Sequence, residues 1–193
     1  MTDLYISATS IDVRDGSGET LATFDYFQPA SEVVAGLSAA FGSPPITEDY
    51  LSENTEQHPG TRYSWGNTYA KDSGSGLNPY TPGDFVFVDE DPVGVPPYLP
   101  NTRVLVASDA VNGVHISTID GIAVGDNAAE LAARHPDTAY RSPHDGALDL
   151  TVGPVPLPPA DWNADPVFSV QVRAPDPLGP ITVFVAPSPN WGV

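Results

Sequence analysis

The chain has 193 residues, of which 40% are hydrophobic and 17% are charged, so it can bury a core and is not expected to be disordered throughout. Its 25 acidic and 7 basic residues give a net charge of −18, and such a surface repels nucleic acids and anionic membranes. The absence of cysteine excludes disulfides, thiolate metal sites and a cysteine nucleophile.

The acidic excess has two interpretations, which the sequence leaves open. It keeps the protein soluble, or it attracts cations and basic partners. No stretch approaches the ~20 consecutive apolar residues of a membrane-spanning helix, and no signal peptide precedes Thr2. We therefore expect either a cytosolic protein or an exported one whose leader is missing from this sequence.

The N-terminal residues are predicted to form a hairpin and a helix. Residues 4–13 alternate apolar and polar side chains as one strand, and residues 21–27 return as its partner after a Gly-rich turn. Residues 30–41 carry apolar side chains at helical spacing, and Gly42 ends this helix. Residues 46–60 are polar without periodicity, which predicts a long surface loop.

Short strands alternate with flexible segments in the middle of the chain. Residues 61–66 and 85–88 are predicted strands, and the Gly-, Ser- and Pro-rich residues 71–83 between them form a flexible excursion. Residues 93–100 are an extended, proline-rich connector. This connector joins the two structural halves that we expect within a single domain, residues 1–92 and 101–193.

The second half has the same kinds of element. Residues 103–110 and 113–119 are predicted to form a hairpin, and residues 126–135 a helix that Pro136 stops. Three more strands follow at residues 147–152, 167–173 and 181–185, the last two as a closing hairpin. The elements together predict an α+β fold, an antiparallel β-sheet with two short helices.

A strand-turn-helix order occurs twice among these elements. Residues 121–131 (Gly-Ile-Ala-Val-Gly-Asp-Asn-Ala-Ala-Glu-Leu) run from a turn through a short strand at Ile122 and Val124 into a helix that Asp126 can cap. Residues 21–42 follow a similar order, so we expect an internal repeat. The run at 121–131 resembles the repeated unit of β-lactamase inhibitor proteins and of small bacterial outer-membrane assembly lipoproteins, in which a helix packs on an antiparallel sheet.

A second resemblance concerns location. Residues 11–13, 24–30, 63–65 and 119–126 resemble segments of uncharacterised secreted or lipid-anchored proteins of actinobacteria. The resemblance implies a secreted protein or an extracellular, membrane-anchored lipoprotein. Neither resemblance includes a catalytic motif, so both concern fold and location rather than chemistry.

The residue types that usually carry chemistry are not arranged in known motifs. The histidines (His58, His115, His135 and His144) lack the H-x-x-x-H spacing of metal sites, and no serine lies in a G-x-S-x-G turn. Asp89-Glu90-Asp91 offers clustered oxygens without the spacing of a calcium loop, so either solvated turns or a weak calcium site would explain it. We expect no catalytic residue, no metal site and no cofactor.

Aromatic residues gather around the Gly-rich excursion, and they are the best candidates for ligand binding. Tyr63, Trp65, Tyr69 and Tyr80 lie close to or within this segment, and aromatics on flexible loops are typical of recognition surfaces. The alternative is that Tyr63 and Trp65, which alternate with Ser64, cover the core from one face of a sheet.

The sequence therefore predicts a non-enzymatic extracellular or cell-surface binding domain of unknown ligand. The expected partner is a protein or small ligand at the cell surface that carries basic groups, with no nucleic acid and no membrane span, and the domain is expected to be monomeric. The alternative is a proteinaceous inhibitor of a secreted enzyme, which rests on the resemblance in fold alone.

Overall fold

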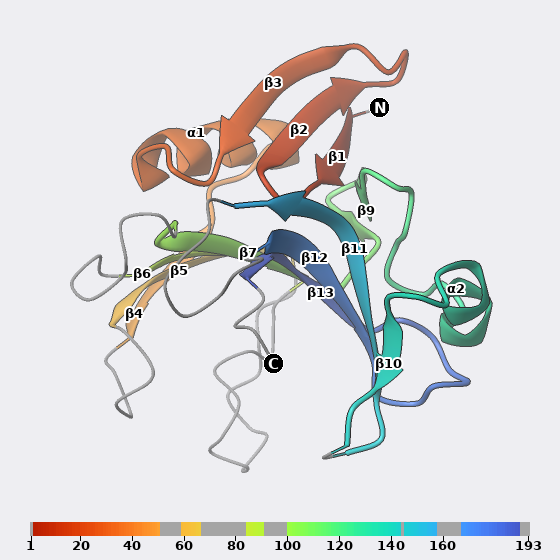
Figure 1. Cartoon of the computed structure of the whole chain (residues 1–193). Helices are drawn as coiled ribbons and strands as arrows, with labels where there is room; N and C mark the ends of the chain where they lie inside the picture. Colours follow the sequence, from red (N-terminus) through yellow and green to blue (C-terminus); the bar gives the residue numbers. More distant parts are fainter. Residues whose placement is uncertain are drawn as a thin grey trace.

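The computed structural model describes residues 2–50, 59–66, 84–90, 100–143, 145–157 and 167–189. These residues form two β-sheets, mostly antiparallel, and two short helices, which confirms the predicted α+β class. In Figure 1 the first three strands and the first helix lie above the larger sheet, and the second helix lies beside one end of it. No helix in the described part of the chain is long and apolar enough to cross a membrane.

The smaller sheet has five strands in the order β3-β2-β1-β9-β8. Its neighbours pair antiparallel except β1 and β9, which are parallel. The single strand predicted at residues 4–13 is wrong, because the chain turns at Ser7, whose N–H donates to the carbonyl of Ser10 at 2.9 Å. The strands are β1 (Thr2–Ile6), β2 (Ser10–Asp15), β3 (Thr20–Asp25), β8 (Ala110–Val111) and β9 (Val114–Thr118).

The larger sheet has eight antiparallel strands in the order β10-β11-β12-β13-β7-β6-β5-β4. The loop predicted at residues 46–60 is wrong over its first five residues, which form the edge strand β4. The strands are β4 (Ile46–Tyr50), β5 (Gly60–Trp65), β6 (Phe85–Glu90), β7 (Thr102–Val106), β10 (Ala139–Arg141), β11 (Leu148–Pro156), β12 (Val167–Ala174) and β13 (Val183–Pro189).

Both predicted helices are present. Helix α1 (Ala30–Phe41) ends at Gly42, whose left-handed backbone (φ 68°) is readily adopted by glycine. Helix α2 (Ala128–Arg134) lies within the predicted residues 126–135 and is capped by Asn127, whose side chain accepts from the N–H of Glu130 at 3.0 Å. The strand predicted at Ile122 and Val124 is wrong, because this segment has no regular structure.

The hairpin predicted for residues 103–119 is also wrong in part. Only β8 and β9 form a hairpin, while β7 pairs with β6 and β13 in the other sheet. The chain leaves the larger sheet at Ala107, whose N–H donates to the carbonyl of Asp84, and turns at Ser108, whose hydroxyl donates to the carbonyl of Ala110 at 2.8 Å. The two predicted strands of this hairpin therefore lie in different layers.

Each helix is followed by a four-stranded antiparallel meander, and the two meanders meet in one sheet. We call α1 with β4–β7 the first unit and α2 with β10–β13 the second unit. The last strands of the two units are neighbours, with Val104 opposite Ala186 and Val106 opposite Phe184. The sheet thus has an approximate two-fold arrangement about the β7–β13 pair. A strand and a turn come before each helix, as the predicted repeat requires. The strand before α1 is β3, at the edge of the smaller sheet, whereas the strand before α2 is β9, which lies between β1 and β8.

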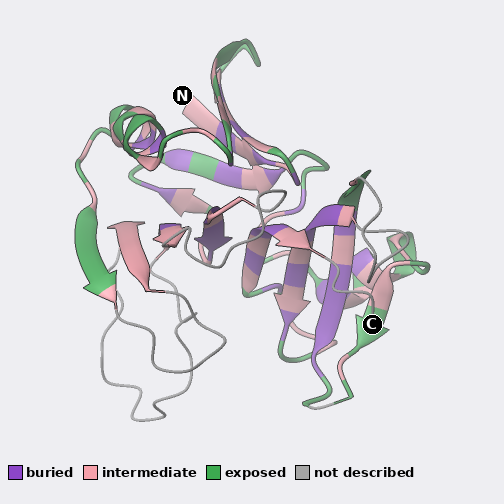
Figure 2. Ribbon diagram, turned by 60° about the vertical axis from the view of Figure 1, so that its left-hand side comes forward, coloured by how far each residue is buried: buried purple, intermediate pink, exposed green. Residues whose placement is uncertain are grey.

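A single core joins both sheets and both helices. One face of the eight-stranded sheet, which we call the core face, packs against the smaller sheet and the helices through residues such as Phe85, Phe87 and Val104. Leu37 of α1 and Leu131 of α2 have no exposed surface. The opposite or outer face carries a small separate cluster (Val86, Val88 and Leu105). In Figure 2 the inner strands are largely buried, whereas β4 is exposed along most of its length.

Candidate functional site

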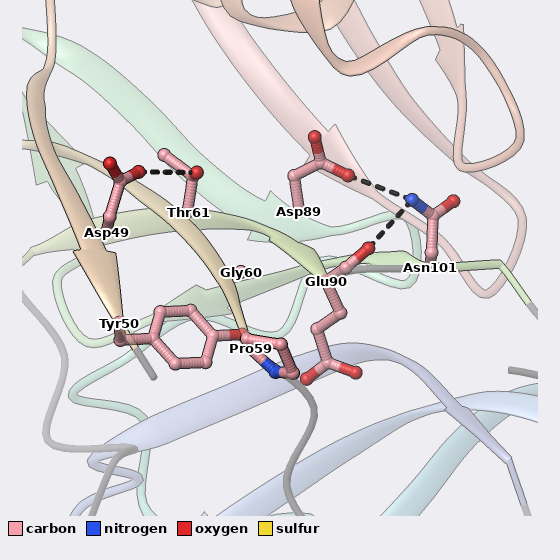
Figure 3. Close-up of a pocket in the computed structure, with 8 residues that line it drawn as sticks. All are labelled: Asp49, Tyr50, Pro59, Gly60, Thr61, Asp89, Glu90 and Asn101. Atoms are coloured by element: carbon pink, nitrogen blue, oxygen red, sulfur yellow. Dashed lines mark hydrogen bonds between the residues drawn. The ribbon is translucent and has the colours of Figure 1, made fainter. Parts of the chain in front are cut away.

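A pocket of about 440 Å³ lies where the strands of the first unit end. The final residues of β4 and β6 and the first residues of β5 line it, together with the residue that precedes β7 (Figure 3). Its lining is rich in carboxylates: Asp49, Tyr50, Pro59, Gly60, Thr61, Asp89, Glu90 and Asn101.

Strand register explains how distant residues meet here. Asp49 lies opposite Thr61, and Thr61 lies opposite Asp89, so these three residues form one row across β4, β5 and β6. Tyr50, Gly60 and Glu90 form the next row. Since successive side chains point to opposite faces of a sheet, the first row faces the core side and the second the outer side. Figure 3 shows this division, with Asp49 and Asp89 on one side of the strands and Tyr50 on the other.

Asp49 and Asp89 are held by neutral partners. The hydroxyl of Thr61 donates to Asp49 Oδ1 at 2.8 Å, and the side-chain amide of Asn101 donates to Asp89 Oδ1 at 2.9 Å and to the carbonyl of Glu90 at 3.1 Å. Within the described residues neither carboxylate forms an ion pair. An ionised carboxylate offers about four acceptor sites, so both retain capacity for further donors.

The arginines that the structure describes in the first unit lie on its other face. Glu90 forms an ion pair with Arg103, and the guanidinium carbon of Arg62 lies 4.3 Å from the centre of the Tyr50 ring. Arg62 and Arg103 both lie opposite Val88, an outer-face residue. Asp49 and Asp89 therefore point away from both arginines.

The electrostatics of this row are shaped by partial burial. Burial raises the pKa of Asp89 above its ordinary value. Burial also raises the pKa of Tyr63, and the negative charges of Asp89 and Asp49 raise it further. Tyr63 is half-buried on the core face. Because the charges of Asp49 and Asp89 affect its pKa, this predicted binding residue lies close to both carboxylates.

Gly60 lets the strands and the Tyr50 ring approach closely. A Cβ atom at this position would lie 2.3 Å from the carbonyl oxygen of Asp89 and 2.9 Å from the hydroxyl of Tyr50. Any side chain here would push against backbone, which cannot move without disturbing the β5–β6 pairing. The glycine thus fixes the shape of the outer-face wall of the pocket.

The aromatic residues predicted to bind a ligand divide into three cases. Trp65 is only 2% exposed, donates from its indole N–H to the carbonyl of Ser43 at 3.0 Å and packs against Phe41 and Phe85, so its assignment to a binding surface is wrong and it belongs to the core. Tyr63 packs on Phe87 but keeps an exposed part, and it stays a prediction. Tyr69 and Tyr80 lie outside the described residues.

Of the other candidates considered from the sequence, those that the structure describes do not come together in a site. His115 is exposed on β9 and His135 lies at the end of α2, while His58, His144 and Asp91 lie outside the described residues. No group of three or more histidines or carboxylates in the described ranges is placed to hold a metal ion. Sequence reasoning noticed Asp89 and Glu90 but missed Asp49, Thr61 and Asn101, which only the strand register brings to them.

A second charged cluster lies in the second unit and has a different character. One nitrogen of Arg173 donates to both carboxylate oxygens of Asp149 at 2.8 and 2.9 Å, and the other donates to Asp145. The Asp149 side chain is only 3% exposed, and burial raises its pKa although Arg173 lowers it. This arrangement is an internal ion pair that neutralises a buried charge.

No protein-family model, no curated protein and no solved structure matches this chain.

Proposed function

We propose that this chain is a non-enzymatic binding domain that recognises basic groups of its partner at the pocket where β4–β7 end. The observation that carries the proposal is the pairing of Asp49 and Asp89 with a hydroxyl and an amide instead of a cation. A guanidinium or ammonium group would satisfy their remaining acceptor sites through charge-assisted hydrogen bonds.

Two features of the surroundings support a cationic ligand. The net charge of −18 attracts basic partners over long range and speeds their association. The half-buried ring of Tyr63 lies beside both carboxylates and offers an aromatic surface to a cation or an alkyl chain.

In the alternative function, that of an enzyme inhibitor, the partner is a secreted enzyme. This alternative rests on the resemblance of residues 121–131 to β-lactamase inhibitor proteins, and a cell-surface location rests likewise on resemblance. Both stay predictions. Loss of activity in an enzyme recovered as the partner would favour the inhibitor.

Calorimetric titration with short peptides tests the proposal. We expect affinity to rise from peptides with no arginine to those with one and two, and to fall as salt is added. Asp49→Asn and Asp89→Asn should each weaken binding of the two-arginine peptide by about tenfold, which corresponds to one charge-assisted hydrogen bond of about 1.5 kcal/mol.

The control is Asp109→Asn, which removes one charge from an exposed residue that follows β7, whereas the pocket residue Asn101 precedes this strand at its other end. This variant should bind like the wild type. Equal weakening in all three variants would show that only the net charge matters, and the pocket would then have no role.

A further inference from the structure

We propose that the open edge of β4 accepts an extended segment of the partner as an added β-strand, with two adjacent basic residues of that segment facing Glu48 and Asp49. The inference rests on the proposed function and names the class of partner, a basic peptide segment. It begins from the position of β4 at the end of the eight-stranded sheet.

Over Ile46–Asp49, the outer edge of β4 has no partner among the described residues. The strand pairs with β5 on one side only, over five residue pairs. Ile46, Thr47, Glu48 and Asp49 are exposed, and none of them has a hydrogen bond to a segment other than β5. An edge strand presents N–H and C=O groups of alternate residues outward, and these groups can pair with another extended chain.

Comparison with the other sheet edges singles out β4. Strands β8 and β10 have two and three residues, which is too short to hold a peptide. Strand β3 is longer, but its pairing with β2 shifts register between Val13 and Arg14, whereas the β4–β5 register is unbroken. Strand β4 contains no proline, lysine or bulge, and the charges that it does carry, on Glu48 and Asp49, oppose pairing with an acidic strand but favour a basic one.

The side chains of β4 define the chemistry of the segment. Residues directly opposite in paired strands have Cβ atoms about 4.5–5.5 Å apart and point to the same face. A basic residue opposite Asp49 would therefore lie at the mouth of the pocket, and a basic residue opposite Glu48 would lie on the outer face. Ile46 is 59% exposed and favours an apolar residue opposite it.

A second copy of this chain is a poor occupant of the same edge. Two molecules with a charge of −18 repel each other, and pairing two β4 strands would bring Glu48 and Asp49 of one copy close to the same residues of the other. The charge therefore favours a basic segment of another protein over a homodimer.

Two blocked hexapeptides test the inference, Thr-Val-Thr-Arg-Arg-Thr and its reverse, which match β4 in parallel and antiparallel pairing respectively. Each is compared with two N-methylated forms. One form is methylated on the backbone nitrogens of its odd-numbered residues and the other on those of its even-numbered residues. N-methylation removes main-chain donors and keeps the charges. We expect one hexapeptide to bind, one of its methylated forms to lose about tenfold or more in affinity, and the other to bind nearly as well.

The outcomes separate the two proposals. If a hexapeptide binds and both methylated forms bind equally well, strand addition is wrong while recognition of basic groups stands. If neither hexapeptide binds, both proposals fail. On the protein side, Glu48→Gln should weaken binding of the hexapeptide, whereas Asp109→Asn should not.

Discussion

In the second unit, Arg173 holds the buried carboxylate of Asp149 with two hydrogen bonds and contacts Asp145 as well. In the first unit, Asp89 receives an amide and Asp49 a hydroxyl, and no cation reaches either of them in the described residues. Each unit has one helix and four strands, yet one neutralises its acid internally and the other leaves acceptor sites of its acids unfilled among the described residues. If the proposed function holds, the same sheet serves stability at one end and recognition at the other.

The largest effect is expected where the second unit loses its internal cation. Arg173→Met leaves Asp149 buried without a counter-charge and should lower the free energy of unfolding by about 3–5 kcal/mol at neutral pH. The deficit should shrink as the pH falls, because protonation removes the buried charge. Urea denaturation at several pH values measures both changes.

Two further variants show whether the buried charge is the cause. Asp149→Leu added to Arg173→Met should restore most of the lost stability, since no unpaired charge remains. Arg14→Met removes an arginine from its pair with Asp12, whose side chain is more exposed than that of Asp149 (15% against 3%), so this change should lower stability by less than Arg173→Met does. Equal losses in Arg173→Met and Arg14→Met would contradict the distinction between the two kinds of pair.

The helices offer a test of equivalence between the units. Leu37 and Leu131 are both completely buried, so changing either to alanine should lower the free energy of unfolding by about 2–5 kcal/mol. Similar losses would indicate that the two helices anchor their units in the same way. An unchanged melting temperature for Leu131→Ala would show that the shorter helix α2 is dispensable for the fold.

A smaller effect distinguishes the helices. Glycine in the middle of a helix is usually less stable than alanine by about 1 kcal/mol, but a Cβ at Gly36 of α1 would lie 2.0 Å from the ring of Phe24 in β3. We therefore expect Gly36→Ala to lower stability by about 1–3 kcal/mol by displacing this ring. Thermal melting of Gly36→Ala, alone and combined with Phe24→Leu, separates the gain in helix propensity from the cost of displacing the ring. A more stable single variant would mean that the ring moves freely.

The smallest effect concerns the pocket itself and has a defined sign. Burial raises the pKa of Asp89 above the ordinary value of 3.8, so the folded protein binds this proton more tightly than the unfolded chain does. Between these two pKa values the contribution of Asp89 to stability falls as the pH rises. Asp89→Asn keeps an acceptor for Asn101 and cannot ionise, so its stability relative to the wild type should rise with pH across this window and then level off.

The opposite sign is expected at Asp15. Hydrogen bonds from Ser17 and Glu19 lower the pKa of Asp15 below 3.8, so its charged form stabilises the fold and this contribution is lost as the pH falls through the lowered pKa. Asp15→Asn should therefore become less stable relative to the wild type as the pH rises. If melting curves show the same pH trend for both variants, burial is not what sets the pKa of Asp89.

The sequence predicted those elements whose signals are local. Helix α1 was placed correctly because its apolar spacing and the stop at Gly42 both lie within the helix itself. Strand β4 was missed because four of its five side chains are exposed, so neither face leaves an apolar alternation. The place of β7 in the larger sheet was missed because pairing between distant strands leaves no trace in either strand alone.

The candidate site depends on the same distant pairing. Asp49 and Asp89 are 40 residues apart and become neighbours only through the register of β5 between them. The sequence leaves Trp65 open between a binding surface and the core, because a tryptophan near a Gly-rich segment is typical of a binding loop and of a core strand alike. Burial against Phe41 decides between the two, and that contact is made by a helix more than 20 residues away.

Strand β13 lies in the interior of the larger sheet, although it is the last of the described strands along the chain. During synthesis the first unit emerges from the ribosome with the edge of β7 uncovered, and the strand that covers this edge begins roughly 75 residues later. At about 5–20 residues per second, that edge is open for about 4–15 seconds. Over this interval the N–H and C=O groups of β7 that later pair with β13 have no strand beside them, so we expect the nascent chain to be a target for chaperones or for aggregation.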